Sequence, residues 1–355
     1  MKTIKTTLKI ALLLLIFISC KDDDPTPEVA QIVTDATVNT EVGGANEPNQ
    51  VYFDFSSNTQ KTVQRDAWDL RFYNGNSFRV SLNSSIAMAV KQLDATDLNA
   101  VTTATVQDLL SVVATQTFDP SNTAFVDDFD GDILHTAIAE VSDSPEQNKV
   151  YLLNLGYQVG TDTPNLGSVA IKGDLRGWKK IRILKQNGNY LLQYANLDDT
   201  TFQEVTISKN SDYNFTFFSF NTNATVDVEP LKENWDLCFT SFTNEIPNAG
   251  TYMYSDFILS NNLQNVKAYE VNTADFSFED FSKTDIVEGS FLTSQRAVGS
   301  SWRVGGGPGT APQIKTDKFY ILKDAEGNYF KIKFLTLTNE EGERGNAQFE
   351  YSLLK

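Results

Sequence analysis

Hydrophobic residues occur in short runs along the chain from residue 51 onward, and they alternate with polar residues rather than recurring at helical spacing. Aromatic and β-branched residues fill these runs, as in VYFDF (51–55), KIRIL (180–184) and YFKIKFLTL (329–337), and Gly, Asn, Asp or Pro bound them. This pattern is typical of β-strands. Helical periodicity is weak and is best at residues 105–113 and 274–281. The sequence therefore predicts a mainly β protein of antiparallel sheets with minor helix.

The same landmarks occur in the same order in both halves of the chain. They are an aromatic strand (51–55 and 216–220), a Trp-Asp-Leu strand (68–72 and 235–239) and an Ile-Leu-Lys hairpin with a Gly-Asn-Tyr turn (181–190 and 319–329). A period this long indicates duplicated domains rather than a solenoid of short units. We predict a first domain at residues 51–214 and a second at 215–355. Because residues 213–220 both close one copy and open the next, a sheet shared between the two is an open alternative.

Trp68 and Trp235 begin the two Trp-Asp-Leu strands, and we expect both rings to anchor a core. The adjoining Asp69 and Asp236 are unusual, because Asp is disfavoured in strands and yet stands at the same place in both copies. A carboxylate that accepts backbone N–H groups where strands cross would explain this recurrence. A catalytic carboxylate is the alternative, but no acid/base partner stands nearby in the sequence.

The N-terminus predicts a secretory signal peptide at residues 1–19. Three lysines precede an apolar run at residues 10–18, which is too short to span a bilayer. Cys20 directly follows a small residue, and this arrangement resembles a bacterial lipobox, which implies that Cys20 is diacylated and anchored in a membrane. A plain signal peptide is the alternative. The acidic stretch at 21–24 resembles the tag that sends some lipoproteins to the outer face of the outer membrane, although it could be an ordinary solvated tether.

Residues 20–50, which follow the signal peptide, are predicted to be the lipidated Cys and a flexible linker, because they are polar and almost free of aromatic residues. The whole chain carries 29 Lys and Arg against 46 Asp and Glu, a net charge of −17. Nucleic acid and anionic lipid surfaces are therefore poor partners. Once Cys20 carries lipid, Cys238 has no intramolecular partner, so no disulfide framework is expected. Cys238 stands where the first copy has Arg71, and we interpret it as an ordinary strand residue.

These landmarks resemble the HmuY family, the haem-binding lipoproteins of haem-scavenging bacteria. The resemblance depends on the lipobox, the aromatic strand followed by Trp-Asp-Leu, and the closing pattern FYILKDAEGNYFKIKF … GNAQFEYSLL. It covers nearly all of residues 51–355 and is clearest in the second half. It implies two HmuY-like domains in tandem, each of antiparallel sheets. It also implies a haem held by two axial His or Met side chains from loops, and transfer of that haem to an outer-membrane transporter.

Candidate haem ligands are few in this chain. Iron in a b-type haem needs an imidazole or a soft donor, and the chain offers His135, Met88 and Met253 once the signal peptide is removed. His135 lies in the middle segment of the first half, as the resemblance implies, but residues 266–318 of the second half contain neither His nor Met. A bis-His site is impossible within one chain, whereas His/Met, single-His or Tyr ligation remains open. The alternative is an ordinary structural role for His135 and hydrophobic packing for the two methionines.

An acidic stretch around Gly131 is the other candidate site. Its four carboxylates look like part of a calcium loop, but the closing bidentate Glu of an EF-hand is absent. A solvated acidic turn is the alternative that the sequence favours. The four residues are Asp127, Asp128, Asp130 and Asp132.

Three classes of function are compatible with these features. The first is a haem-binding surface lipoprotein in haem and iron acquisition. The second is a surface lipoprotein of the same fold that binds another small ligand, a glycan or a protein. The third is a hydrolase with paired carboxylates, but no carboxylate spacing supports it, and a single His removes most triad chemistry. We therefore expect a binding protein rather than an enzyme.

Overall fold

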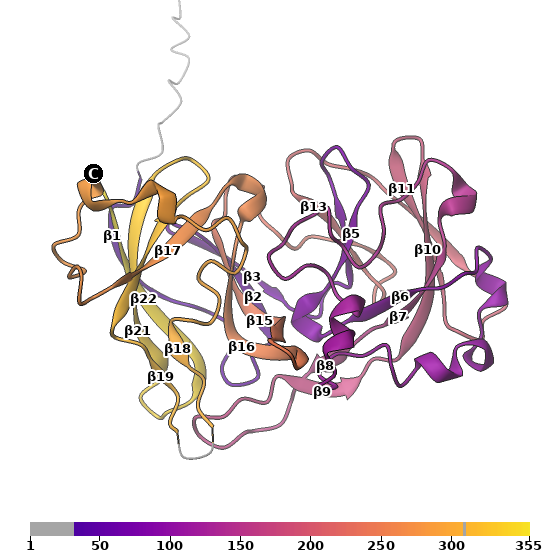
Figure 1. Cartoon of the computed structure of the whole chain (residues 1–355), viewed down its shortest axis with the longest axis horizontal. Helices are drawn as coiled ribbons and strands as arrows, with labels where there is room; N and C mark the ends of the chain where they lie inside the picture. The colour runs from indigo at the N-terminus through magenta and orange to yellow at the C-terminus, as the bar shows by residue number, and fades with distance from the viewer. Residues whose placement is uncertain (1–31, 308–309) are drawn as a thin grey trace, which may run out of the picture. The chain divides into compact units, whose positions relative to one another are not determined.

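The computed structural model describes residues 32–307 and 310–355. The predicted signal peptide, Cys20 and the acidic stretch at 21–24 lie outside the described residues. Strands dominate the described chain, in antiparallel sheets that face each other in pairs (Figure 1). This agrees with the mainly β prediction. None of the described helices is long and apolar enough to cross a membrane.

The first pair of sheets, which we call sandwich 1, is built from one continuous stretch of chain, residues 70–226. One sheet has the strand order β14-β13-β4-β5, with β4 at Leu70–Tyr73, β5 at Val80–Leu82, β13 at Phe215–Ser219 and β14 at Ala224–Val226. The other has the order β12-β11-β10-β7-β6, with β6 at Ala89–Gln92, β7 at Val150–Asn154, β10 at Trp178–Gln186, β11 at Asn189–Ala195 and β12 at Gln203–Ile207. Leu70, Phe72, Ile181, Leu192 and Phe218 belong to the core between them.

The second pair, sandwich 2, is discontinuous in sequence. One sheet has the order β16-β15-β2-β3, with β2 at Asn49–Asp54, β3 at Thr59–Gln64, β15 at Leu237–Ile246 and β16 at Gly250–Ser260. The other has the order β1-β22-β21-β20-β17, with β1 at Asp35–Asn39, β17 at Lys267–Asn272, β20 at Lys318–Lys323, β21 at Tyr329–Thr338 and β22 at Arg344–Leu353. Val51, Phe53, Phe239, Phe330 and Phe349 belong to their common core.

The two sandwiches exchange their aromatic strands. β2 is the aromatic strand of the first copy, but it pairs with β15, the Trp-Asp-Leu strand of the second copy. Reciprocally, β13 from the second copy pairs with β4 from the first. The predicted boundary between residues 214 and 215 therefore does not separate the sandwiches, because each Trp-Asp-Leu strand takes its partner from the other side of it. Sandwich 1 is an insertion between β3 and β15 of sandwich 2.

A third hydrophobic cluster joins the two inner sheets. Alternate residues of a strand face opposite sides of its sheet, so Val51 and Phe53 of β2 enter the core of sandwich 2 while Tyr52 faces the other way. Tyr52 packs there with aromatic side chains of the neighbouring sheet and with the turn before β15. The buried members of this third cluster are Tyr52, Trp68, Phe215, Phe217, Val228, Trp235 and Cys238. We call this region, between β2–β15 and β4–β13, the seam.

Three local predictions differ from the structure. Residues 105–113 form 3₁₀ turns rather than an α-helix, and 274–281 form turns. Within the predicted linker at 20–50, Asp35–Asn39 forms β1, which pairs with β22. The described 3₁₀ helices are η1 Ser84–Ile86, η2 Leu98–Ala100, η3 Thr103–Thr105, η4 Gln107–Leu109, η5 Pro120–Phe125, η6 Pro145–Gln147, η7 Asn262–Gln264, η8 Lys283–Asp285 and η9 Glu288–Ser290. The remaining strands are β8 Tyr157–Val159 with β9 Lys172–Leu175, and β18 Arg303–Val304 with β19 Gln313–Ile314.

Candidate functional site

The loop between η5 and β7 carries His135, the only His of the chain, and it is anchored by the carboxylate of Asp127. Asp127 Oδ2 accepts a hydrogen bond from the Leu82 N–H of β5 at 2.7 Å, and its Oδ1 accepts one from the Ala137 N–H at 2.9 Å. Burial raises the pKa of Asp127 above its ordinary value, although both hydrogen bonds act in the opposite direction. Asp127 therefore closes the loop at both ends and ties it to sandwich 1.

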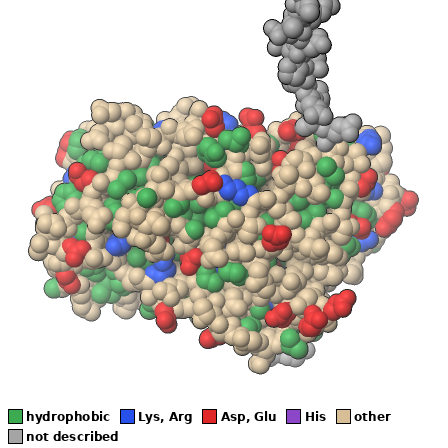
Figure 2. Space-filling view, turned by 180° about the vertical axis from the view of Figure 1, so that it is seen from behind, with side chains coloured by type: hydrophobic (Ala, Val, Ile, Leu, Met, Phe, Trp, Pro, Cys, Tyr) green, Lys and Arg blue, Asp and Glu red, His purple; other side chains and the backbone are tan. Residues whose placement is uncertain are grey.

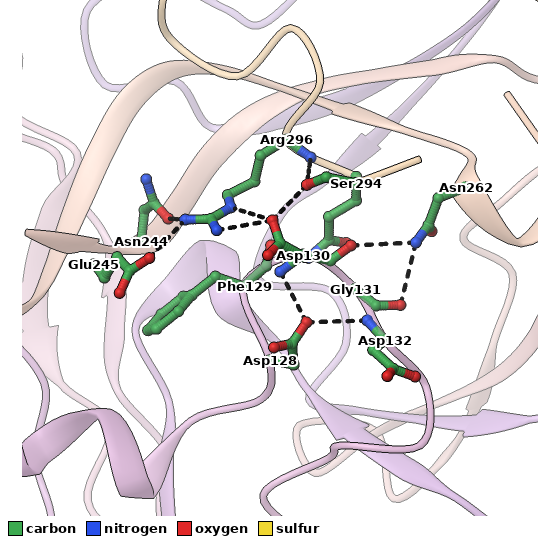
Figure 3. Close-up of polar contacts among 11 residues, drawn as sticks. Asp128, Phe129, Asp130, Gly131, Asp132, Asn244, Glu245, Asn262, Ser294 and Arg296 are labelled. Atoms are coloured by element: carbon green, nitrogen blue, oxygen red, sulfur yellow. Dashed lines mark hydrogen bonds and ion pairs between the residues drawn. The ribbon is translucent and has the colours of Figure 1, made fainter. Parts of the chain in front are cut away.

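The remaining acidic residues of this loop hold its shape. Asp128 Oδ1 accepts the N–H groups of Asp130 and Asp132 at 2.9 and 3.1 Å. Asp130 Oδ1 accepts from Ser294 Oγ at 2.6 Å and from Arg296 Nη2 at 2.8 Å, so the loop is bonded to sandwich 2 as well (Figure 3). Within the described residues, no group of three or more His, Cys, Asp or Glu side chains is arranged to hold a metal ion. The acidic stretch is thus an internally bonded turn.

His135 is held in a carboxylate–imidazole pair at the surface. Its Nδ1 lies 2.7 Å from Asp132 Oδ2, and 74% of its side chain is exposed. Hydrogen bonds from the Leu134 N–H and from the His135 ring lower the pKa of Asp132. No described residue bonds Nε2 of His135. A carboxylate on one ring nitrogen fixes the tautomer and orients the other nitrogen, the arrangement common in metal-ligating histidines.

The two methionines are not arranged around His135. Met88 is buried in the core of sandwich 1, and Met253 is buried in a small cluster with Ala87 and Ile171. A His/Met pair is therefore not formed in this structure. Met88 also borders a cavity of about 20 Å³ together with Asp127 and Asp128. Sites for drug-sized ligands occupy several hundred Å³, so this cavity is far too small for a haem.

The two recurrent aspartates accept backbone hydrogen bonds from the exchanged strands. Asp69 Oδ2 accepts from the Phe220 N–H at 2.6 Å, and Asp236 Oδ2 accepts from the Phe55 N–H at 2.9 Å. Asp69 is also ion-paired to Arg176 at 2.6 Å. Burial raises the pKa of Asp236 well above its ordinary value. Each carboxylate thus fastens a Trp-Asp-Leu strand to the aromatic strand that pairs with it.

The two tryptophans line a cavity in the seam, which the sequence did not reveal as a site. Its volume is about 50 Å³. Trp68 Nε1 donates to Gln50 Oε1 at 2.6 Å, but Trp235 Nε1 is buried without a partner among the described residues. Arg71 and Cys238 also line it. Arg71 and Cys238 stand at the one place where WDLRF and WDLCF differ. This difference between the two copies is the sequence feature that could have pointed to the cavity.

Comparison with known proteins gives one family. The family model described as HmuY protein matches the chain twice, over residues 46–209 and over residues 184–351. A search of curated proteins finds no match.

Solved structures give similarities at low sequence identity. The apo HmuY analog of Tannerella forsythia is 10% identical, with 91% of this chain and 98% of that chain covered and a TM-score of 0.32. A HmuY-like haem-binding protein of Bacteroides vulgatus is 9% identical, with coverage of 91% and 97% and a TM-score of 0.23. A lipoprotein of Bacteroides fragilis is 12% identical, with coverage of 51% and 91% and a TM-score of 0.22. Because the family model matches most of the sequence, and does so twice, the chain belongs to the HmuY family.

Proposed function

We propose that this protein is a lipid-anchored haem-binding protein that takes part in haem acquisition, with His135 as the axial ligand. The observation that carries the proposal is the Asp132–His135 pair, which leaves Nε2 exposed in a chain of the HmuY family. Nε2 is a suitable donor for haem iron. The buried positions of Met88 and Met253 favour ligation by one imidazole over a His/Met pair.

The test is a titration of the soluble chain from Lys21 with ferric haem, followed by absorption. We expect a saturable shift of the Soret band that His135→Ala abolishes. Asp132→Asn should weaken haem binding about 10- to 100-fold, because it removes the carboxylate that orients the imidazole. Met88→Leu and Met253→Leu are matched controls and should bind haem as the unmodified chain does.

The outcomes of this titration distinguish the proposed ligands. A Soret shift that persists in His135→Ala would mean that a Tyr or another donor, and not His135, is the axial ligand of the haem iron. The absence of any shift would contradict haem binding and favour the second candidate, a surface lipoprotein of the same fold that binds a different ligand. The cavity of about 50 Å³ in the seam supports that candidate, since it suits a much smaller molecule than haem.

We also propose that Cys20 carries the lipid anchor, that the anchor lies in the outer membrane, and that the partner for haem transfer is an outer-membrane transporter. The lipobox-like end of residues 1–20 and the acidic stretch after it support this location. Cys20→Ser should move the protein from the membrane to the soluble fraction and abolish incorporation of labelled palmitate. Cys238→Ser is the control and should leave both unchanged.

A further inference from the structure

The seam cavity lies where the two sequence copies differ most in chemistry. Trp68 and Trp235 are equivalent in the two copies, but Arg71 of β4 stands opposite the thiol-bearing strand β15, in which Cys238 replaces it. The partner of the Trp ring differs too, because Gln50 accepts the Trp68 N–H while Phe215 occupies the corresponding place in the second copy. The lining therefore has one cationic side chain beside four acidic ones (Asp127, Asp128, Asp132 and Glu229), and the Trp235 N–H has no acceptor among the described residues.

Three polar atoms at this cavity are buried without a hydrogen-bond partner in the described part of the chain. They belong to residues that line the cavity, namely Arg71 Nε, Trp235 Nε1 and Ser260 Oγ. Leaving a buried donor unpaired costs about 1–3 kcal/mol, so several of them in one place indicate a missing acceptor. Two of the three can only donate, since guanidinium and indole N–H groups have no acceptor function.

The guanidinium of Arg71 lies near two carboxyl groups, and its charge acts to lower the pKa values of both Asp127 and Glu229. It lies 4.3 Å from the centre of the Phe215 ring, and no described carboxylate forms an ion pair with it. The nearby Glu229 uses its Oε1 to accept the Phe215 N–H at 2.7 Å. Burial raises the pKa of Glu229 to about 8, so this carboxyl is mostly protonated at neutral pH. Asp127, on the other wall, accepts hydrogen bonds from the backbone N–H groups of Leu82 in β5 and of Ala137 in the loop.

We propose that the seam cavity is a binding site for a small monocarboxylate such as acetate or formate. Arg71 Nε and Trp235 Nε1 donate to the carboxylate oxygens, and Ser260 Oγ completes the set. The aromatic and aliphatic walls, Tyr52 and Leu259 among them, receive the alkyl end. A water molecule needs about 10–15 Å³ of such volume, so about 50 Å³ accommodates roughly four non-hydrogen atoms.

The test uses the soluble chain from Lys21 without haem, so its result is independent of the proposed haem site. Acetate and formate are titrated by calorimetry and by thermal unfolding, with chloride at equal ionic strength and acetamide as the uncharged analogue. We expect saturable binding and a rise in Tm with the carboxylates alone. Arg71→Gln should weaken affinity about 10- to 100-fold, because it removes charge-assisted hydrogen bonds.

Two further variants make the test specific to this cavity. Trp235→Phe keeps the ring but removes the N–H, and should weaken binding about 5- to 10-fold. Arg79→Gln is the matched control, because Arg79 also has a buried Nε without a partner but lies outside the cavity and pairs with Glu140 at 3.1 Å. Its affinity for acetate should equal that of the unmodified chain. If Arg71→Gln fails to fold, Trp235→Phe carries the comparison.

Cys238 provides a second readout within the cavity, because it is the only thiol in the chain that starts at Lys21. Saturating acetate should slow its alkylation by a neutral maleimide, and acetamide should not. Equal responses to acetate and chloride, or equal losses in Arg71→Gln and Arg79→Gln, would overturn the proposal. Either result would mean that water alone fills the cavity or that carboxylates bind elsewhere.

Discussion

Single buried carboxyl groups give this protein a pH-dependent stability. Glu229 is buried beside the seam, and burial raises its pKa from an ordinary value of 4.5 to about 8. The folded chain therefore binds the proton more tightly than the unfolded chain. Its contribution to stability is fully present below about pH 4.5 and is lost as the pH rises through about 8.

Glu229→Gln is expected to flatten this dependence. The amide cannot ionise, but its oxygen can still accept the Phe215 N–H. Between about pH 5 and about pH 9, the unmodified chain should lose on the order of 4 kcal/mol more stability than the variant. The free energy of unfolding is measured by urea denaturation at both pH values. Part of the slope remains in the variant, because burial also raises the pKa of Glu47 and Asp236.

Glu340→Gln is the control for this comparison, because Glu340 is exposed. It should keep the full pH dependence. An unchanged slope in Glu229→Gln would mean that Glu229 is ionised in the folded protein at neutral pH.

The residue-level prediction of the site was partly achievable from sequence. His135 could be singled out because it is the only imidazole, but its pairing with Asp132 depends on the fold of the loop. Met88 and Met253 are candidates by chemistry alone, and the structure places them in two separate buried clusters. Arg71 and Cys238 were each read as strand residues, since only the pairing of the two inner sheets brings them to one cavity.

At the scale of elements, hairpins follow closely from local sequence. The predicted turn between β10 and β11 has Asn187 at φ 51° and Gly188 at φ 78°, positive values that Asn and Gly adopt readily in tight hairpin turns. Gly188→Ala should destabilise the protein by about 1 kcal/mol in urea unfolding, because Ala resists positive φ. An added Cβ at this position meets no atom within 4 Å, so the loss is due to the backbone alone.

Two companion variants isolate this backbone effect. Gly188→Asn should cost less than Gly188→Ala, because Asn tolerates the left-handed region better than Ala does. Gly289→Ala serves as the control, since Gly289 also has open space around it but no positive φ. Equal losses in Gly188→Ala and Gly289→Ala would contradict a turn that requires positive φ.

Elements that depend on distant contacts were less predictable. The apolar residues of 105–113 do face a common core, since Val106 and Val113 are buried in one cluster. The backbone reaches this arrangement through successive 3₁₀ turns rather than through an α-helix. Their Thr and Val residues are weak helix formers, so packing decides the outcome. The strand exchange was equally hidden. Both aromatic strands have the same alternation of residues between the two faces of the sheet, so each could pair with either Trp-Asp-Leu strand. Local sequence therefore does not distinguish pairing within a copy from pairing between copies.

At the scale of the whole molecule, the exchanged strands join the sandwiches into one folding unit. Residues 32–355 form one compact body, which the space-filling view shows from one side (Figure 2). Hydrogen bonds from Ser241 Oγ to the Ser85 carbonyl at 2.9 Å and from Thr243 Oγ1 to the Ser84 carbonyl at 2.7 Å connect β15 to η1. In sandwich 2, β1, β2 and β3 precede the insertion in the chain, whereas β15 follows it. The folding of sandwich 2 therefore depends on contacts between residues distant in sequence.

Fragment folding tests this topology directly. A fragment of residues 66–232 contains every strand of sandwich 1 and should unfold cooperatively in urea, with lower stability than the whole chain because its seam face is uncovered.

Fragments 51–214 and 215–355, divided at the repeat boundary, should each fail to fold alone. The first lacks β13, which lies between β4 and β14, and the second lacks β2, which lies between β15 and β3. Mixing the two fragments should restore the β-sheet circular dichroism signal, because each supplies the strand that the other needs. Cooperative folding of 51–214 by itself would contradict the exchange, since β4 and β5 would then have to form a stable sheet without the strand that Asp69 fastens beside them.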